Sequence, residues 1–446
     1  MNRRAASAKA SPSLKQLAIR GVAWTTVGHA VSMGLRLVSN LILTRLLFPE
    51  AFGLMAIVNI VRFGLEMFTD IGAGPAILRD EQGDEPKFYN TAWTMQVVRG
   101  FGLCAVACAL AWPIAKLYEQ PDLVALIAVA GSTAIIAGFN STAIFTLTRH
   151  MELGKLTLLG IVEHLCGLIV TVCWAYLSPS VWALVAGLVS GALCRMLWSH
   201  RLIPGYSNRF VWNRDALKKL IRFGKWIFLS SAFYFASTQM DRILLGHYTT
   251  ISFLGIYSVA TLLSEALVLL IYKTCHHVVY PAFGRVFRDE PHNLKKVYYK
   301  ARLSFDLALM PGLGVLTVVG AFLVQFLYDE RYADAGWMFQ LLCIRVAMRS
   351  MLEPCEMCLV AIGQPRYAFF QQVARFIWVL VGIPVMWHYA GIEGLVWTAA
   401  LSEVPALLVL WSGALAHRLL SFRRELASFT LFLGTVAIGK LILRMI

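Results

Sequence analysis

The chain has 446 residues, of which 58% are hydrophobic and only 15% are charged. A mean hydropathy of +0.66 excludes an ordinary soluble protein and predicts a polytopic membrane protein. The net charge of +15 could indicate nucleic-acid binding, but the basic residues gather in the connections predicted to lie on one side of the membrane. The excess positive charge therefore orients the protein, and we expect no nucleic acid among its partners.

Thirteen apolar runs are long enough to be membrane-spanning helices, since about 20 helical residues cross the hydrocarbon layer. Backbone polar groups in lipid must pair within their own segment, and these runs are too long and too evenly apolar for barrel strands. We therefore predict an all-α polytopic bundle, with the thirteenth run as a possible extra C-terminal helix. The runs cover residues 21–43, 51–75, 90–115, 122–147, 156–177, 181–199, 221–246, 252–275, 303–327, 336–361, 368–389, 392–415 and 427–443.

The first two predicted helices form a hairpin around which the rest of the chain is organised. Phe48-Pro49-Glu50 marks its turn. A proline is tolerated in the first turn of a helix, and an acidic side chain suits the positive end of the helix dipole. One helix should therefore end before this tripeptide, and the next should begin within it.

Charged side chains inside this apolar hairpin are candidate functional residues. The first helix carries Arg36, and the second carries Arg62, Glu66 and Asp70 at four-residue spacing. Residues four apart lie on the same face of a helix. The sequence therefore predicts one charged stripe on the second helix.

A second charged stripe lies in the other half of the chain. Arg345, Arg349 and Glu353 follow one another at four-residue spacing in the tenth predicted helix, and Asp241 lies near the end of the seventh. An arginine near mid-membrane costs roughly 2.5–3.5 kcal/mol when it faces lipid. These side chains must therefore face water, a ligand or partners inside the bundle.

Two explanations of the arginines stay open. They can be paired with carboxylates inside the bundle, as buried ions normally are. Alternatively, they line a hydrated cavity and bind an anionic group such as a phosphate or pyrophosphate, and the acids hold them or couple transport to protons and the membrane potential. The predicted binding residues are Arg36, Arg62, Arg345 and Arg349, and the predicted coupling or charge-pairing residues are Glu66, Asp70, Asp241 and Glu353.

The two halves of the chain show a weak internal repeat. A forward shift of 202 residues places Trp24 on Trp226 and Gly53 on Gly255. An even number of crossings separates the copies, so both enter the membrane from the same side. We predict two six-helix lobes related by a pseudo-twofold axis along the membrane normal. Their predicted boundaries, with the extra C-terminal segment, are residues 1–204, 205–416 and 417–446.

The sequence predicts no cofactor or metal site. The nine cysteines fall within or at the ends of predicted spans, and the pair Cys355 and Cys358 lacks the two further ligands of a zinc site. The chain has no G-x-x-x-x-G-K-[ST] phosphate loop. No predicted outside loop is large enough for a catalytic platform, so we expect a protein that is not an enzyme.

Two stretches resemble the polysaccharide-transport branch of the multidrug/oligosaccharidyl-lipid/polysaccharide exporter superfamily. The first is LILTRLLFPEAFGLMAIV, followed by a charged second helix and DIGAGPAIL. The second is STQMDRILLGHYTTISFLGIYSVATLL, which is similar to the seventh and eighth helices of that family. The resemblance covers both predicted lobes.

This resemblance implies a flippase of the bacterial inner membrane that works by alternating access. It would move a polyprenyl-pyrophosphate-linked oligosaccharide to the periplasmic leaflet for surface or exopolysaccharide biosynthesis. Its partners would be that substrate, membrane lipid, and the polymerase and export machinery of a polysaccharide pathway. The distribution of basic residues places the N-terminus in the cytoplasm.

Two alternative functions are kept. A cation-coupled multidrug exporter of the same superfamily needs mainly acidic, apolar-lined pockets, and here arginines compete with the acids. A membrane-embedded glycan polymerase or ligase predicts sugar-bond formation by the purified protein, which a flippase does not give.

Overall fold

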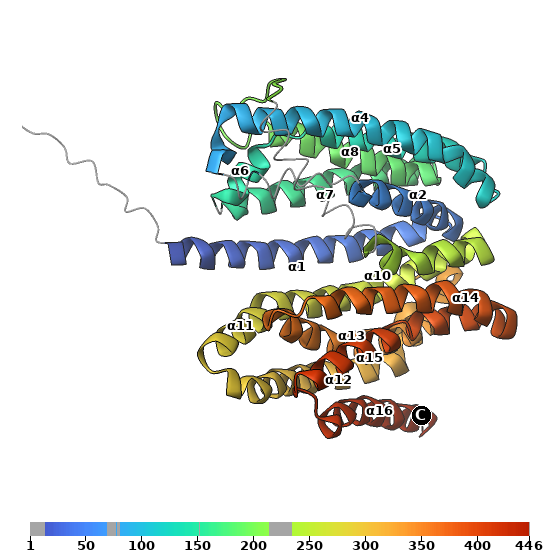
Figure 1. The fold of residues 1–446 in the computed structure, drawn as a ribbon. Helices are drawn as coiled ribbons and strands as arrows, with labels where there is room; N and C mark the ends of the chain where they lie inside the picture. The colour runs from blue at the N-terminus through green and yellow to red at the C-terminus, as the bar shows by residue number, and fades with distance from the viewer. Residues whose placement is uncertain (1–13, 69–76, 78–80, 151, 214–233, 446) are drawn as a thin grey trace, which may run out of the picture.

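The computed structural model describes residues 14–68, 77, 81–150, 152–213 and 234–445. Over these residues the chain is a bundle of long helices without strands, as Figure 1 shows. Seven described helices are long and apolar enough to cross a membrane, or eight if the bent pair α5 (Asp122–Gly138) and α6 (Ala143–Arg149) is one span. The predicted all-α polytopic fold is therefore confirmed.

The first lobe contains the helices before residue 200, coloured blue to green in Figure 1. Besides α5 and α6, these are α1 (Leu14–Leu46), α2 (Pro49–Phe68), α4 (Pro86–Leu117), α7 (Leu153–Leu177) and α8 (Val181–Ser199). The first helix ends and the second begins at the predicted tripeptide. α4 packs along α5, α7 packs along α8, and α1 lies against α7.

The second lobe follows in yellow to red. Its described helices cover residues 234–248, α10 (Ile251–Thr274), α11 (Tyr280–Asp289), α12 (Leu294–Leu327), α13 (Ala335–Ala361), α14 (Arg366–Ala400) and α15 (Glu403–Ala416). Most residues of α13 are buried, because α10, α12, α14 and α15 all pack against it. Each lobe contains six described spans if α5 and α6 count as one, the ten-residue α11 is left out, and α14 is divided at Gly391 so that its last part joins α15. α2 packs against α10 between the lobes.

One predicted span is broken. The sequence predicts a single helix over residues 122–147, whereas α5 and α6 are separate and bent by 60°. At the break, the Ser141 peptide N–H donates to the Ser199 hydroxyl at 2.9 Å instead of to a helix carbonyl. The Ser141 hydroxyl donates to Asn208 at 2.7 Å. Contacts to distant side chains therefore replace helical hydrogen bonds here, which the local sequence does not reveal.

The predicted spans 368–389 and 392–415 are joined by a sharp turn at Gly391. This glycine has φ 55° and ψ −138°, a conformation that residues with a side chain rarely adopt. After it the chain runs back, and Trp378 Nε1 donates to the Thr398 carbonyl across the two arms at 3.0 Å. The last part of α14 and α15 together form the returning span.

The extra C-terminal segment forms α16 (Phe422–Met445), which is long and apolar enough to cross a membrane. α16 packs along α12. Arg302 Nη1 lies 3.0 Å from Glu425 Oε2, and the Ser428 hydroxyl donates to Asp306 one turn further along. The contacts advance in the same order on both helices, so α16 runs parallel to α12. A buried ionic cluster fixes the beginning of α16.

Replacing Glu425 with Ala should weaken this attachment. Arg302 is only 2% exposed and would keep a single carboxylate, Asp306, at 3.2 Å. An under-compensated buried charge costs about 3–5 kcal/mol, so the purified protein in detergent should show a lower midpoint of thermal unfolding. Glu290→Ala, at an exposed position, is the matched control, and equal midpoints for the two variants would contradict this account of α16.

Candidate functional site

α13 presents the second predicted stripe to its neighbouring helices. Arg349 Nη2 lies 2.8 Å from Glu353 Oε2, as the four-residue spacing favours. The side chains of Arg345 and Arg349 are 23% and 14% exposed, whereas that of Glu353 is 1% exposed. The two arginine side chains are therefore partly exposed, whereas the carboxylate of Glu353 is buried.

Glu403 connects this stripe to α14. Its carboxylate forms an ion pair with Arg375, and it lies 3.7 Å from both Arg345 Nε and Arg349 Nη1. Glu403 is the first residue of α15, where the positive end of the helix dipole favours a carboxylate. Its side chain is 3% exposed. Three guanidinium groups therefore supply most of the compensation that this buried charge needs.

Asp241 joins the network from the helix over residues 234–248. Asp241 Oδ2 lies 3.5 Å from Arg345 Nη1 and accepts a hydrogen bond from the Tyr257 hydroxyl at 3.1 Å. The next residue, Arg242, forms a separate ion pair with Glu265 of α10. Asp241 is thus a partner of Arg345 across a helix interface.

Polar side chains widen the network. The Gln372 side-chain oxygen accepts hydrogen bonds from the Ser237 hydroxyl at 2.7 Å and from Arg375 Nη1 at 3.3 Å. His276, in the π-helical turn after α10, has its Nε2 atom 3.7 Å from Glu353 Oε1. Side chains from most helices of the second lobe therefore meet in one ionic cluster.

Within the described residues, several donors of this cluster have no hydrogen-bond partner. They are Nε and Nη1 of Arg349 and Nε of Arg375, all buried. Arg345 meets its two carboxylates only at 3.5 and 3.7 Å, beyond the roughly 2.7–2.9 Å of a charge-assisted hydrogen bond. The guanidinium groups therefore keep unused hydrogen-bonding capacity, and Arg345, whose side chain is 23% exposed, is the most accessible of the three arginines.

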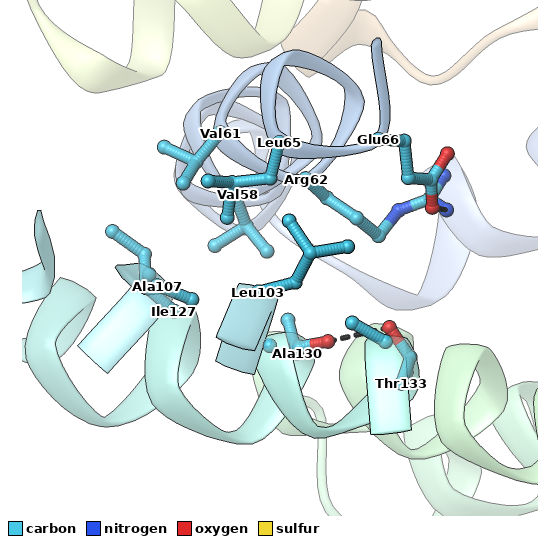
Figure 2. A pocket seen from close by; sticks show the side chains of 12 residues that line it. Val58, Val61, Arg62, Leu65, Glu66, Leu103, Ala107, Ile127, Ala130 and Thr133 are labelled. Atoms are coloured by element: carbon cyan, nitrogen blue, oxygen red, sulfur yellow. Dashed lines mark hydrogen bonds and ion pairs between the residues drawn. The ribbon is translucent and has the colours of Figure 1, made fainter. Parts of the chain in front are cut away.

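The first lobe carries a smaller ionic site on α2. Arg62 Nη1 lies 2.6 Å from Glu66 Oε1, and the two side chains are 33% and 46% exposed. Arg99 of α4 donates to the Glu66 carbonyl oxygen at 3.0 Å. The pair lies at one edge of a narrow pocket between α2, α4 and α5, whose other labelled walls are mainly apolar (Figure 2). Arg62 is therefore paired but open to one side.

The remaining predicted residues lie apart from these clusters. Arg36 is exposed on α1, and Asp70 lies outside the described residues. Over the part of the chain that the structure describes, Arg36 and Arg62 share no carboxylate partner with the arginines of α13. The structure brings the predicted residues Asp241, Arg345, Arg349 and Glu353 together in the second lobe, and it pairs Arg62 with Glu66 in the first.

Arg375, Glu403 and His276 belong to the cluster but are not among the predicted site residues. Arg375 and Glu403 each interrupt an apolar run, and a charge inside a predicted span is a functional candidate by default. That signal does not say that both side chains meet the α13 stripe. His276 gives no comparable signal, because it stands at the end of a predicted span.

The described residues offer electrostatic rather than metal chemistry. No group of three or more His, Cys, Asp or Glu side chains among them could hold a metal ion. Cys355 and Cys358 are buried free thiols on α13. Guanidinium groups can bind and release anions, and the carboxylates can hold the guanidinium groups between such events.

The described helices thus form two lobes, and a partly exposed ionic cluster lies among the helices of the second lobe, as is common in transporters. The family described as "Polysaccharide biosynthesis protein" matches residues 42–336. Since this match covers more than half of the chain, the chain belongs to that family.

Related proteins support this assignment. The chain is 21% identical over 383 residues to the lipopolysaccharide biosynthesis protein WzxC of Escherichia coli (strain K12), covering 86% of this chain and 77% of the relative. It is 22% identical over 401 residues to the succinoglycan biosynthesis transport protein ExoT of Rhizobium meliloti (strain 1021), covering 88% and 79%.

The fold is similar to that of a solved flippase. The lipid II flippase MurJ in an inward closed conformation superposes with a TM-score of 0.75 at 10% identity, covering 94% of this chain and 92% of that chain. The predicted membership of the polysaccharide-transport branch is confirmed. The chain therefore belongs to a family of polysaccharide biosynthesis proteins and has the fold of a solved flippase.

Replacing Glu403 with Gln should destabilise the second lobe. Three guanidinium groups would lose a shared counter-ion, and breaking a buried ion pair costs about 3–5 kcal/mol. We expect unfolding at a lower denaturant concentration, measured by the loss of helical circular dichroism. Glu393→Gln, exposed on α14, should unfold like the parent chain. If Glu403→Gln did so too, Glu403 would not be the counter-ion of this cluster.

Proposed function

We propose that the chain moves a polyprenyl-pyrophosphate-linked oligosaccharide from the cytoplasmic to the periplasmic leaflet of the bacterial inner membrane. The order of exposure in the second-lobe cluster carries this proposal. Arg345 and Arg349 are partly exposed, whereas the carboxylates of Glu353 and Glu403 are almost fully buried. An anion that reaches the cluster meets positive charge first. The relatives named for lipopolysaccharide and succinoglycan biosynthesis support a glycan cargo.

In this proposal, arginines bind the pyrophosphate group. A guanidinium group is planar, permanently charged, and matches phosphate oxygens with paired N–H donors. Arg345 and Arg349 supply these donors in the second lobe, where part of their hydrogen-bonding capacity is unused. Arg36 and Arg62 supply them from the first lobe.

The carboxylates hold the arginines when no cargo is bound. Asp241 holds Arg345 and Glu353 holds Arg349. In the first lobe, Glu66 holds Arg62. A bound phosphate competes with these carboxylates for the same donors, so cargo can be released without leaving an arginine uncompensated. We assign the same acids, together with Asp70, to coupling with protons or the membrane potential.

Alternating access is the transport mechanism that suits two lobes. The segments 1–204 and 205–416 move against each other, and the segment 417–446 follows the second lobe. The N-terminus lies in the cytoplasm, the lipid tail of the cargo stays in the bilayer, and no bond is made or broken. A polysaccharide polymerase and export machinery receive the product on the periplasmic side.

Single substitutions Arg345→Ala and Arg62→Ala should each reduce export of the surface polysaccharide in cells that lack the chromosomal copy. Removing a charged hydrogen-bonding partner costs about 1.5–3 kcal/mol, which is about 10- to 100-fold in binding. Polysaccharide is measured at the cell surface, and the amount of protein in the membrane is measured in parallel. Arg345→Lys keeps the positive charge but not the planar guanidinium group. Export by this variant should therefore lie between that of Arg345→Ala and that of the parent chain.

Arg285→Ala is the matched control, because this side chain is 82% exposed on α11. Export unchanged by Arg345→Ala and Arg62→Ala at normal protein levels would contradict the role given to these arginines. Drug susceptibility of the same strains tests the multidrug alternative. A loss of drug resistance with intact polysaccharide export would favour that alternative.

A further inference from the structure

α2 and α10 cross at one end of the bundle, which we call the hairpin end. It is the end at which α1 turns into α2 and residues 249–250 lead into α10. A Cβ atom on Gly53 would lie 2.0 Å from the carbonyl oxygen of Ile251, and one on Gly255 would lie 1.9 Å from that of Pro49. The two helices therefore meet backbone to backbone, which only glycine allows at these positions.

This crossing has the symmetry of the internal repeat. The shift of 202 residues places Pro49 on Ile251 and Gly53 on Gly255. Gly53 thus contacts Ile251, which is the counterpart of Pro49, and Gly255 contacts Pro49 itself. The two contacts are the same contact made in opposite directions. Such reciprocal contacts are the mark of a twofold interface. The pseudo-twofold axis therefore runs through the crossing.

At the same end, two tyrosine hydroxyl groups donate hydrogen bonds to backbone carbonyl oxygens of the other lobe. Tyr332, between α12 and α13, donates to the carbonyl oxygen of Leu47 just after α1 at 3.0 Å. Tyr118, between α4 and α5, donates to the carbonyl oxygen of Ile243 in the helix over residues 234–248 at 3.2 Å. Each lobe thus holds the end of the first helix of the other lobe.

Arg331 adds further contacts between the lobes next to the Tyr332 hydrogen bond. Its Nη2 atom donates to the Arg45 carbonyl oxygen at 3.1 Å, and its guanidinium carbon lies 4.9 Å from the centre of the Phe48 ring. Asp329 accepts a hydrogen bond from Arg331 Nε at 2.8 Å. Hydrogen bonding to Arg331 lowers the pKa of the Asp329 carboxyl group, so the pair stays ionised at neutral pH.

The packing directly beneath the crossing is tight. Ile57 and Val259 follow Gly53 and Gly255 by four residues, so they lie one turn further in on the same helix faces. They are 2% and 1% exposed. Ile57 and Val259 are therefore closed off from solvent beneath the crossing.

We propose that the crossing of Gly53 with Gly255 and the hydrogen bonds of Tyr118 and Tyr332 form a single latch. The latch closes the hairpin end and must separate before cargo leaves there. This inference rests on the proposed function. It specifies which contacts between the lobes break during transport and that they break at the hairpin end.

Chemical access to Val259 tests the latch. Val259→Cys places a thiol beneath it, and a bulky charged maleimide is added to the full chain in nanodiscs. Peptide mass spectrometry separates modification at this position from that of the nine native cysteines. Adding Tyr118→Phe and Tyr332→Phe together should raise the modification rate at least about fivefold, because losing two hydrogen bonds shifts a two-state equilibrium by at least that factor.

Gly53→Ala should also raise the modification rate, because the added methyl group clashes with backbone rather than with a movable side chain. Two matched controls should leave it unchanged. A Cβ atom on Gly102 of α4 has no heavy atom within 4 Å, which makes Gly102→Ala harmless. Tyr176 of α7 is 78% exposed, so Tyr176→Phe removes no buried hydroxyl.

Modification that stays slow in the folded tyrosine double variant would overturn the latch. If Gly53→Ala fails to fold, the tyrosine variants still decide the question, since they add no atoms. The export assay separates this inference from the proposed function. Faster modification in the latch variants, combined with intact export in Arg345→Ala, would support the latch and contradict the binding role of that arginine.

Discussion

Charged side chains inside a membrane-spanning bundle must be compensated by the protein, because lipid cannot solvate them. The second lobe meets this constraint with Glu403, which stands among Arg345, Arg349 and Arg375. The compensation is incomplete, since Arg349 and Arg375 keep buried donors without hydrogen bonds. A cluster that keeps unused donors beside its carboxylates has the property that the proposed transport of a phosphate-linked lipid needs.

The two lobes have a similar arrangement of helices but different sets of charged side chains. The crossing at Gly53 and Gly255 repeats the same contact in both directions, whereas the ionic groups are distributed unequally. On α2, Arg62 has one carboxylate partner, Glu66, while the arginines of α13 share several. Symmetry therefore governs the contact between the lobes, whereas the larger of the described ionic clusters lies in the second lobe.

The spans and the hairpin turn could be predicted from the sequence, because hydropathy, helix length and the preference of proline for a first turn are local properties. The pairing of Arg349 with Glu353 follows from helical spacing for the same reason. The bend at Ser141 and the meeting of Arg375 with Glu403 could not be predicted, since both depend on which distant helix lies alongside. The lobe boundaries and the binding role of the arginines stay predictions.

Binding of a short-chain polyprenyl diphosphate to the purified protein in nanodiscs tests the central claim most directly. The account predicts that the parent chain and Arg285→Gln bind it alike, and that Arg345→Gln combined with Arg349→Gln weakens binding at least about tenfold at low salt. Equal affinity of the double variant and the parent chain, with both folded, would contradict the claim that these guanidinium groups receive the cargo.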